Sequence, residues 1–120
     1  MSHGRTILPS IVVVIREDPL KTHRAVEALR IALGLSTGEN PLTIVLLGHA
    51  PLLLAEDAED IVDGEILEKY LPSLQQLEIP FVVPTGTRPS YSLDLGFKVH
   101  EASTSDISAL MAESDRVIVF

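Results

Sequence analysis

Three short segments of the chain carry side chains that could bind an anion or move a proton. In the first, Asp18-Pro19 has the composition of a helix start, with Asp at the cap and Pro at the first helical position. Thr22 and His23 follow within the expected first turn. A helix N-terminus, a hydroxyl and an imidazole would together suit a small anion. The same residues also fit an ordinary capped helix with a surface histidine.

The second segment is Gly48-His49, which directly follows an apolar run. An imidazole titrates close to neutral pH, so His49 could act as a general base or donate a hydrogen bond to a ligand. A loop histidine that bonds only to its own chain is an equally good interpretation.

The third segment, Thr85-Gly86-Thr87-Arg88, indicates a ligand site most directly. Glycine lets the backbone approach a ligand, while two hydroxyls and a guanidinium supply donors for an oxyanion. The alternative is a plain surface loop stiffened by the prolines on either side. The segment is not a Walker loop, and no G-x-G-x-x-G motif follows any predicted strand.

Other chemistry finds little support in the sequence. The four histidines have no metal-ligand spacing, so we expect neither a metal nor a cofactor; they are His3, His23, His49 and His100. A nucleophilic hydroxyl, as on Thr87, Ser90 or Ser92, would need a base and an orienting acid, for which there are only scattered candidates.

Composition removes several classes of function. The 120 residues include no cysteine, which excludes disulfides, thiolate metal sites and cysteine nucleophiles. Seventeen acidic and nine basic residues give a net charge of −8, which disfavours nucleic acid and anionic membrane surfaces as partners. With no signal-peptide pattern and no long apolar run, we expect one cytoplasmic domain spanning residues 1–120.

The elements that position these segments alternate between strands and helices. Ile11 to Ile15 is a run of five β-branched residues, which is typical of a strand covered on both faces. The predicted strands are 11–15, 42–47, 79–83, 97–99 and 117–120. Helical spacing follows Asp18 and ends at Gly34, and a second helical pattern covers 66–77, where Pro72 predicts a kink or a fresh helix near Leu71. Ser103 and Asp106 have the spacing of a helix cap.

This alternation predicts an α/β fold with three α/β/α layers and a mostly parallel sheet of about five strands. Ligands in such folds collect at the carboxyl ends of the strands. That edge should gather Arg16, Glu17 and Asp18, then His49, and then the segment 85–88.

Two further segments bear on partners. Residues 56–65 hold six acidic residues and no basic one, which fits a solvated face or, as an alternative, a docking surface for a basic partner. The apolar stretch Pro51-Leu52-Leu53-Leu54 lies outside the predicted strands, and we expect part of it to be buried between subunits.

Over nearly its whole length the chain resembles the DsrE/DsrF-like family, which includes the DsrEFH and TusBCD sulfur-relay subunits. The resemblance depends on the order and spacing of four segments. They are Ile11-Val-Val-Val-Ile-Arg-Glu-Asp-Pro, Thr22-His-Arg-Ala-Val-Glu-Ala-Leu-Arg-Ile-Ala, Val45-Leu-Leu-Gly-His-Ala-Pro-Leu-Leu-Leu and Ser114-Asp-Arg-Val-Ile-Val-Phe.

The resemblance implies a sulfur-handling role with one departure. In sulfur-carrying members, the loop after the third strand bears the cysteine that accepts persulfide sulfur, and here the matching position is Pro84, Thr85 or Thr87. The family therefore implies a non-catalytic binding or assembly component, a homo-oligomer such as a trimer or hexamer, and a cysteine-bearing sulfur carrier as partner. The alternative is a protein or enzyme that binds a small anion or nucleotide with His49 and Arg88.

Overall fold

A computed structural model describes residues 9–56 and 58–120. Three earlier predictions fall outside these residues: those on His3, on the amino-terminal segment, and on Asp57 of the acidic run. The elements in chain order are β1 (Ile11–Ile15), α1 (Arg24–Leu35), β2 (Leu42–Leu46), η1 (Ala50–Leu54), α2 (Gly64–Gln76), β3 (Phe81–Pro84), α3 (Thr87–Tyr91), β4 (Val99–Ala102), α4 (Thr104–Glu113) and β5 (Arg116–Val119).

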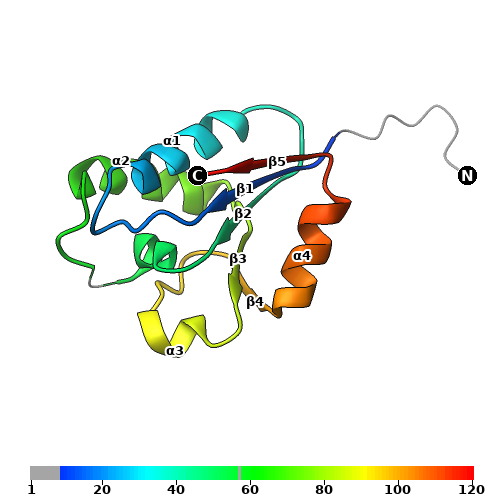
Figure 1. The fold of residues 1–120 in the computed structure, drawn as a ribbon. Helices are drawn as coiled ribbons and strands as arrows, with labels where there is room; N and C mark the ends of the chain where they lie inside the picture. Colours follow the sequence, from blue (N-terminus) through cyan, green and yellow to red (C-terminus); the bar gives the residue numbers. More distant parts are fainter. Residues whose placement is uncertain (1–8, 57) are drawn as a thin grey trace, which may run out of the picture.

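The five strands form one sheet in the order β4-β3-β2-β1-β5, and every neighbouring pair is parallel. From β1 to β4 the chain steps in one direction across the sheet, and then it crosses back to place β5 beside β1. Right-handed crossovers therefore put α1 and α2 on one face and α4 on the other (Figure 1). The predicted three-layer α/β fold is confirmed.

The core has two parts, one on each face of the sheet. On the side of α1 and α2, the strands contribute alternate residues such as Val13, Ile44 and Phe81, which pack against helix residues such as Leu29 and Leu74. On the α4 side a smaller layer holds Val12, Val14, Val45 and Ile107. Because β1 is covered on both faces, all five of its residues are buried, as its continuous apolar run predicts.

Several local predictions are wrong or shifted; the strand predicted at 97–99, for example, is β4 at 99–102. The first helix begins at Arg24 and not at Pro19, because Asp18 caps a separate turn in which its carbonyl accepts from the amides of Lys21 and Thr22. Gly34 lies within this helix, whose last residue is Leu35.

The second helix runs without a break from Gly64 to Gln76, through Pro72, so no fresh helix begins near Leu71. Pro72 is exposed, and the burial of Leu67 and Leu74 on either side of it holds the helix together despite the missing amide.

The segment after β3, expected as a loop, folds as the short helix α3 (Thr87–Tyr91). Gly86 takes a left-handed conformation with φ 93° just before it, and Pro89 lies in the first turn, where a missing amide removes no hydrogen bond within the helix.

Most of the Pro51–Leu54 stretch is buried within one chain, whereas we expected part of it to be buried between subunits. It forms η1, and Pro51, Leu53 and Leu54 are buried against the chain's own core. The apolar composition of this stretch is therefore explained within one copy of the chain.

Candidate functional site

The end of β2 is turned by Gly48, which brings His49 to the carboxyl edge of the sheet. Gly48 has φ 60°, a conformation that glycine adopts without strain, and the amide of Ala50 then bonds to the carbonyl of Leu47 at 3.0 Å. His49 precedes η1 and is exposed. The sheet thus presents this imidazole where parallel α/β folds gather ligands.

His49 bonds to Tyr91, the last residue of α3. Its Nδ1 lies 3.0 Å from the Tyr91 hydroxyl oxygen, and that hydroxyl donates to the Gly48 carbonyl at 3.3 Å. A tyrosine hydroxyl has one proton, and a carbonyl can only accept. That proton serves one bond at a time, so the tautomer of His49 decides whether Nδ1 donates to the hydroxyl or accepts from it.

The segment after β3 uses most of its polar groups within the chain. The Thr85 amide donates to the Ala102 carbonyl at 3.1 Å, which extends the ladder between β3 and β4. The Thr87 hydroxyl donates to the Pro84 carbonyl at 2.6 Å, and Thr87 is only 7% exposed. Thr87 is therefore a structural hydroxyl, while the side chain of Thr85 stays exposed beside Gly86.

Arg88 connects α3 to β4. Its backbone amide donates to the Glu101 carboxylate at 2.9 Å, and its guanidinium donates to the Val99 carbonyl. A guanidinium has five N–H donors, so this bond positions the group without using its whole capacity for an oxyanion.

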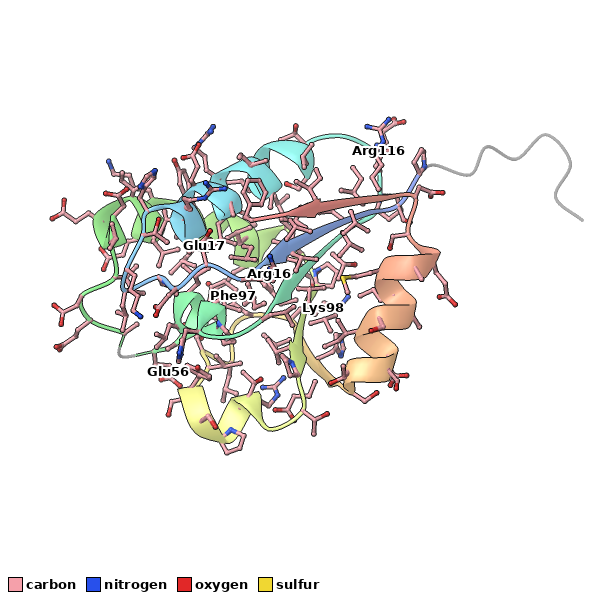
Figure 2. The ribbon with its side chains drawn as sticks, in the orientation of Figure 1. Arg16, Glu17, Glu56, Phe97, Lys98 and Arg116 are labelled. Atoms are coloured by element: carbon pink, nitrogen blue, oxygen red, sulfur yellow. The ribbon has the colours of Figure 1, made fainter. Side chains whose placement is uncertain are left out.

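Asp18 and Thr22 serve the turn before α1. The Asp18 carboxylate accepts from the Leu20 amide at 2.9 Å, and the Thr22 hydroxyl accepts from the Arg24 amide at 3.2 Å. Arg24 also pairs with Glu17 at 3.5 Å, and Figure 2 shows Glu17 just beyond the end of β1.

The structure therefore joins only part of the predicted site. We call the residues His49, Tyr91, Thr85, Gly86 and Arg88 the strand-end cluster, which the β2 turn and α3 bring together. Asp18 and Thr22 make no hydrogen bond to this cluster among the described residues.

The described cavities do not enclose the strand-end cluster. A cavity of about 300 Å³ lies beside α3 and is lined by Leu52, Ala55, Ala58, Ser90, Tyr91 and Ser92. Tyr91 is the one cluster residue that lines it, so Asp18, His49 and Arg88 share none of the four described cavities. This arrangement gives an exposed surface that carries an imidazole and a guanidinium, and not a closed catalytic pocket.

Two residues that matter here escaped the sequence analysis. Tyr91 is 42 residues from His49, and Glu101 is 13 residues from Arg88. No local pattern links either pair, because the contacts arise from the order of strands in the sheet.

Shifted pKa values lie away from the cluster, on α1. The Arg30 guanidinium bonds to Glu27 one turn earlier, which lowers the pKa of the Glu27 carboxyl and raises the pKa of Arg30. Among residues 9–56 and 58–120, no group of three or more His, Asp or Glu side chains is placed to hold a metal ion. Within the same residues, no helix has the length and apolar composition to cross a membrane.

Comparison with known proteins finds solved structures of the same fold. Neither a protein-family model nor a curated protein sequence matches the chain. Among solved structures, the crystal structure of the ychN protein from E. coli superposes with a TM-score of 0.75, covering 94% of this chain and 100% of ychN. The fold is DsrE-like. At 19% identity, the likeness shows this architecture and no activity.

Proposed function

We propose that this protein is a cysteine-free, DsrE-like component of intracellular sulfur trafficking or sulfur oxidation that binds or assembles and does not itself transfer sulfur. The DsrE-like fold supports a place in sulfur trafficking or sulfur oxidation. The absence of cysteine supports a role in binding or assembly without sulfur transfer. A persulfide forms on a thiolate, which neither threonine nor proline can supply.

The geometry of the β3 segment adds to this argument. Pro84 has no side-chain nucleophile, Thr87 is buried and bonded to the Pro84 carbonyl, and only Thr85 is an exposed hydroxyl. We propose that the working form is a cytoplasmic homo-oligomer, a trimer or a hexamer, that meets a cysteine-bearing sulfur carrier. Nucleic acid and membranes are not among the proposed partners.

The first experiment tests the sulfur chemistry with a matched pair of variants. Incubated with a persulfide donor, the wild-type chain should gain no increment of about 32 Da in intact-mass spectrometry, because it has no thiolate. Thr85→Cys should gain sulfur faster than Leu95→Cys, whose parent side chain is 85% exposed and lies outside the cluster. Equal rates for the two variants would contradict a sulfur-handling origin for this position.

The second experiment tests the partner. The tagged protein is recovered from native lysate, and retained proteins are labelled for persulfide. Retention of a protein with a persulfidated cysteine, lost when that cysteine is blocked, supports the proposed role. Retention of no persulfide-bearing protein contradicts it.

A second candidate function, binding of a small anion or a nucleotide, is favoured by one observation. Arg88 is exposed, and its bond to the Val99 carbonyl leaves further N–H donors of the guanidinium for an oxyanion. If this surface binds inorganic phosphate, Arg88→Ala should weaken binding about ten- to a hundredfold in titration calorimetry. Lys69→Ala is the control, since it removes an exposed cation on α2, outside the cluster. Absence of binding by the wild type, or equal binding by both variants, contradicts this candidate.

A further inference from the structure

The two edge strands of the sheet, β4 and β5, differ in the contacts that they make. At the β4 border, the Val99 carbonyl accepts from the Arg88 guanidinium, and Glu101 holds the first turn of α3 through the Arg88 amide. At the opposite border lies β5, the red strand of Figure 1, and no described strand lies beyond it.

The backbone groups of β5 divide cleanly between the two sides of the strand. The amides of Arg116 and Phe120 donate to the carbonyls of Ser10 and Val14 at 3.0 and 2.8 Å, so the even-numbered positions face β1. Neighbouring residues of a strand direct their backbone groups to opposite sides. The amides and carbonyls of Val117 and Val119 therefore point outward from the sheet.

The side chains of these two residues are apolar and exposed. Val117 is 40% exposed and Val119 is 51% exposed. In the register of β5 with β1 they lie opposite Val12 and Val14, which are 1% and 2% exposed. The two valines thus extend the apolar layer on the α4 side of the sheet to the edge strand β5, where their side chains are exposed to solvent.

We propose that β5 pairs antiparallel with β5 of a second copy of this chain, around a two-fold axis at Ile118. This inference rests on the assembly part of the proposed function and names the surface that is used; a two-fold pair fits the proposed hexamer, as three pairs, and not the trimer. Val117 of each copy lies opposite Val119 of the other and exchanges two hydrogen bonds with it, so the pair forms four in total.

This register follows from the strand itself. A two-fold axis at Val117 or at Val119 would pair that residue with its own copy and leave the other outward residue beyond the described strand of the partner, with two hydrogen bonds formed. The axis at Ile118 uses both outward residues of both copies. It also brings four β-branched side chains together on the α4 side, a favourable cross-strand combination.

Charge does not oppose the pairing. The net charge of −8 repels copies in general, but residues 116–119 contain no acidic side chain and one arginine. Figure 2 shows Arg116 at the beginning of β5, on the far side of the molecule from Glu56 in the acidic run. Exposed apolar residues on an unpaired border strand are the usual basis of such association.

The absence of cysteine makes a site-specific crosslinking test direct. In the proposed register Ile118 lies opposite itself in a pair without hydrogen bonds, with Cα atoms about 4.5 Å apart, which a disulfide spans. The two copies of Val117 are offset by two residues along the strand, about 8 Å apart, which is beyond disulfide reach.

Under mild oxidation, Ile118→Cys should form covalent dimers at least about tenfold faster than Val117→Cys, although position 117 is the more exposed. Equal rates, or faster linkage through position 117, would overturn the proposed register.

A second pair of variants tests the backbone hydrogen bonds. Val119→Pro removes an amide that points away from β1, and proline is tolerated on the open side of a border strand. Val119→Thr keeps the amide. In sedimentation velocity, the proline variant should dimerise about five- to a hundredfold more weakly than the threonine variant, with the circular dichroism spectrum unchanged.

The outcomes separate this inference from the proposed function. An oligomer of unchanged mass in the Val119→Pro variant means that copies meet elsewhere, which overturns the β5 pairing and leaves the proposed function standing. A wild-type monomer at micromolar concentration overturns the pairing and the assembly, while the persulfide-partner experiment still decides the role.

Discussion

The hydrogen bond between His49 and Tyr91 can be measured by a double-mutant cycle. Tyr91→Phe removes the hydroxyl that lies 3.0 Å from His49 Nδ1 and 3.3 Å from the Gly48 carbonyl. A net hydrogen bond contributes about 0.5–1.5 kcal/mol, and Tyr91 is half-buried, so the free energy of unfolding should fall by about 1 kcal/mol. Combined with His49→Ala, the coupling energy should be about 0.5–1 kcal/mol.

Urea denaturation of the wild type, the two single variants and the double variant gives the coupling. Tyr70→Phe is the matched control, because the Tyr70 hydroxyl makes no hydrogen bond to any residue that the structure describes; its effect should stay within about 0.5 kcal/mol. Because His49 Nδ1 bonds to the Tyr91 hydroxyl, nitrogen-detected NMR should show a preference for one His49 tautomer in the wild type, and Tyr91→Phe should lose this preference. Additivity of the single variants within about 0.3 kcal/mol would refute the hydrogen bond.

Three further predictions test the scaffold. Leu29→Ala should lower the free energy of unfolding by about 2–5 kcal/mol in urea, because Leu29 is fully buried between α1 and the sheet; a change below about 1 kcal/mol would contradict that packing. Ser103→Ala should cost about 1 kcal/mol, and Ser103→Asp should restore most of it, because the Ser103 hydroxyl accepts from the Asp106 amide at 3.1 Å; an Asp variant as unstable as the Ala variant would count against the cap. Because Arg30 lowers the pKa of Glu27, their ion pair stabilises the fold at neutral pH and this contribution is lost as the pH falls through the lowered pKa; the stability difference between wild type and Glu27→Gln should therefore shrink in acid, and a constant difference would contradict it.

The fold was predictable where the sequence pattern depends on one element alone. The runs at Ile11–Ile15 and Leu42–Leu46 are apolar at nearly every position. Such short continuous runs are typical of strands that are covered on both faces of the sheet. The Ser103 cap was predictable for the same reason, since a cap is decided within four residues.

The failures occurred where distant contacts outweigh local preference. Asp18-Pro19 has the composition of a helix start, but the Pro19 carbonyl accepts from the amide of Val62, which holds this turn against the segment before α2. Pro51 to Leu54 were assigned to a subunit surface because their burial by the chain's own core cannot be seen from hydrophobicity alone.

The candidate site was half predictable. The rule that ligands meet the carboxyl ends of strands selected His49 and Arg88 without the structure. Their bonding partners, Tyr91 and Val99, depend on the order of the strands, which the sequence pattern did not determine.

The contacts of Arg88 with β4 limit how far strand pairing can extend. A sheet whose two edge strands are both unpaired can add molecules at both edges and grow into a fibre. Here Arg88 and Glu101 tie α3 to β4, so a molecule arriving at that side finds the Val99 carbonyl already engaged. Strand pairing through β5 joins two sheets and then stops, so this contact closes on a pair, and a hexamer would need a second surface that does not extend the sheet.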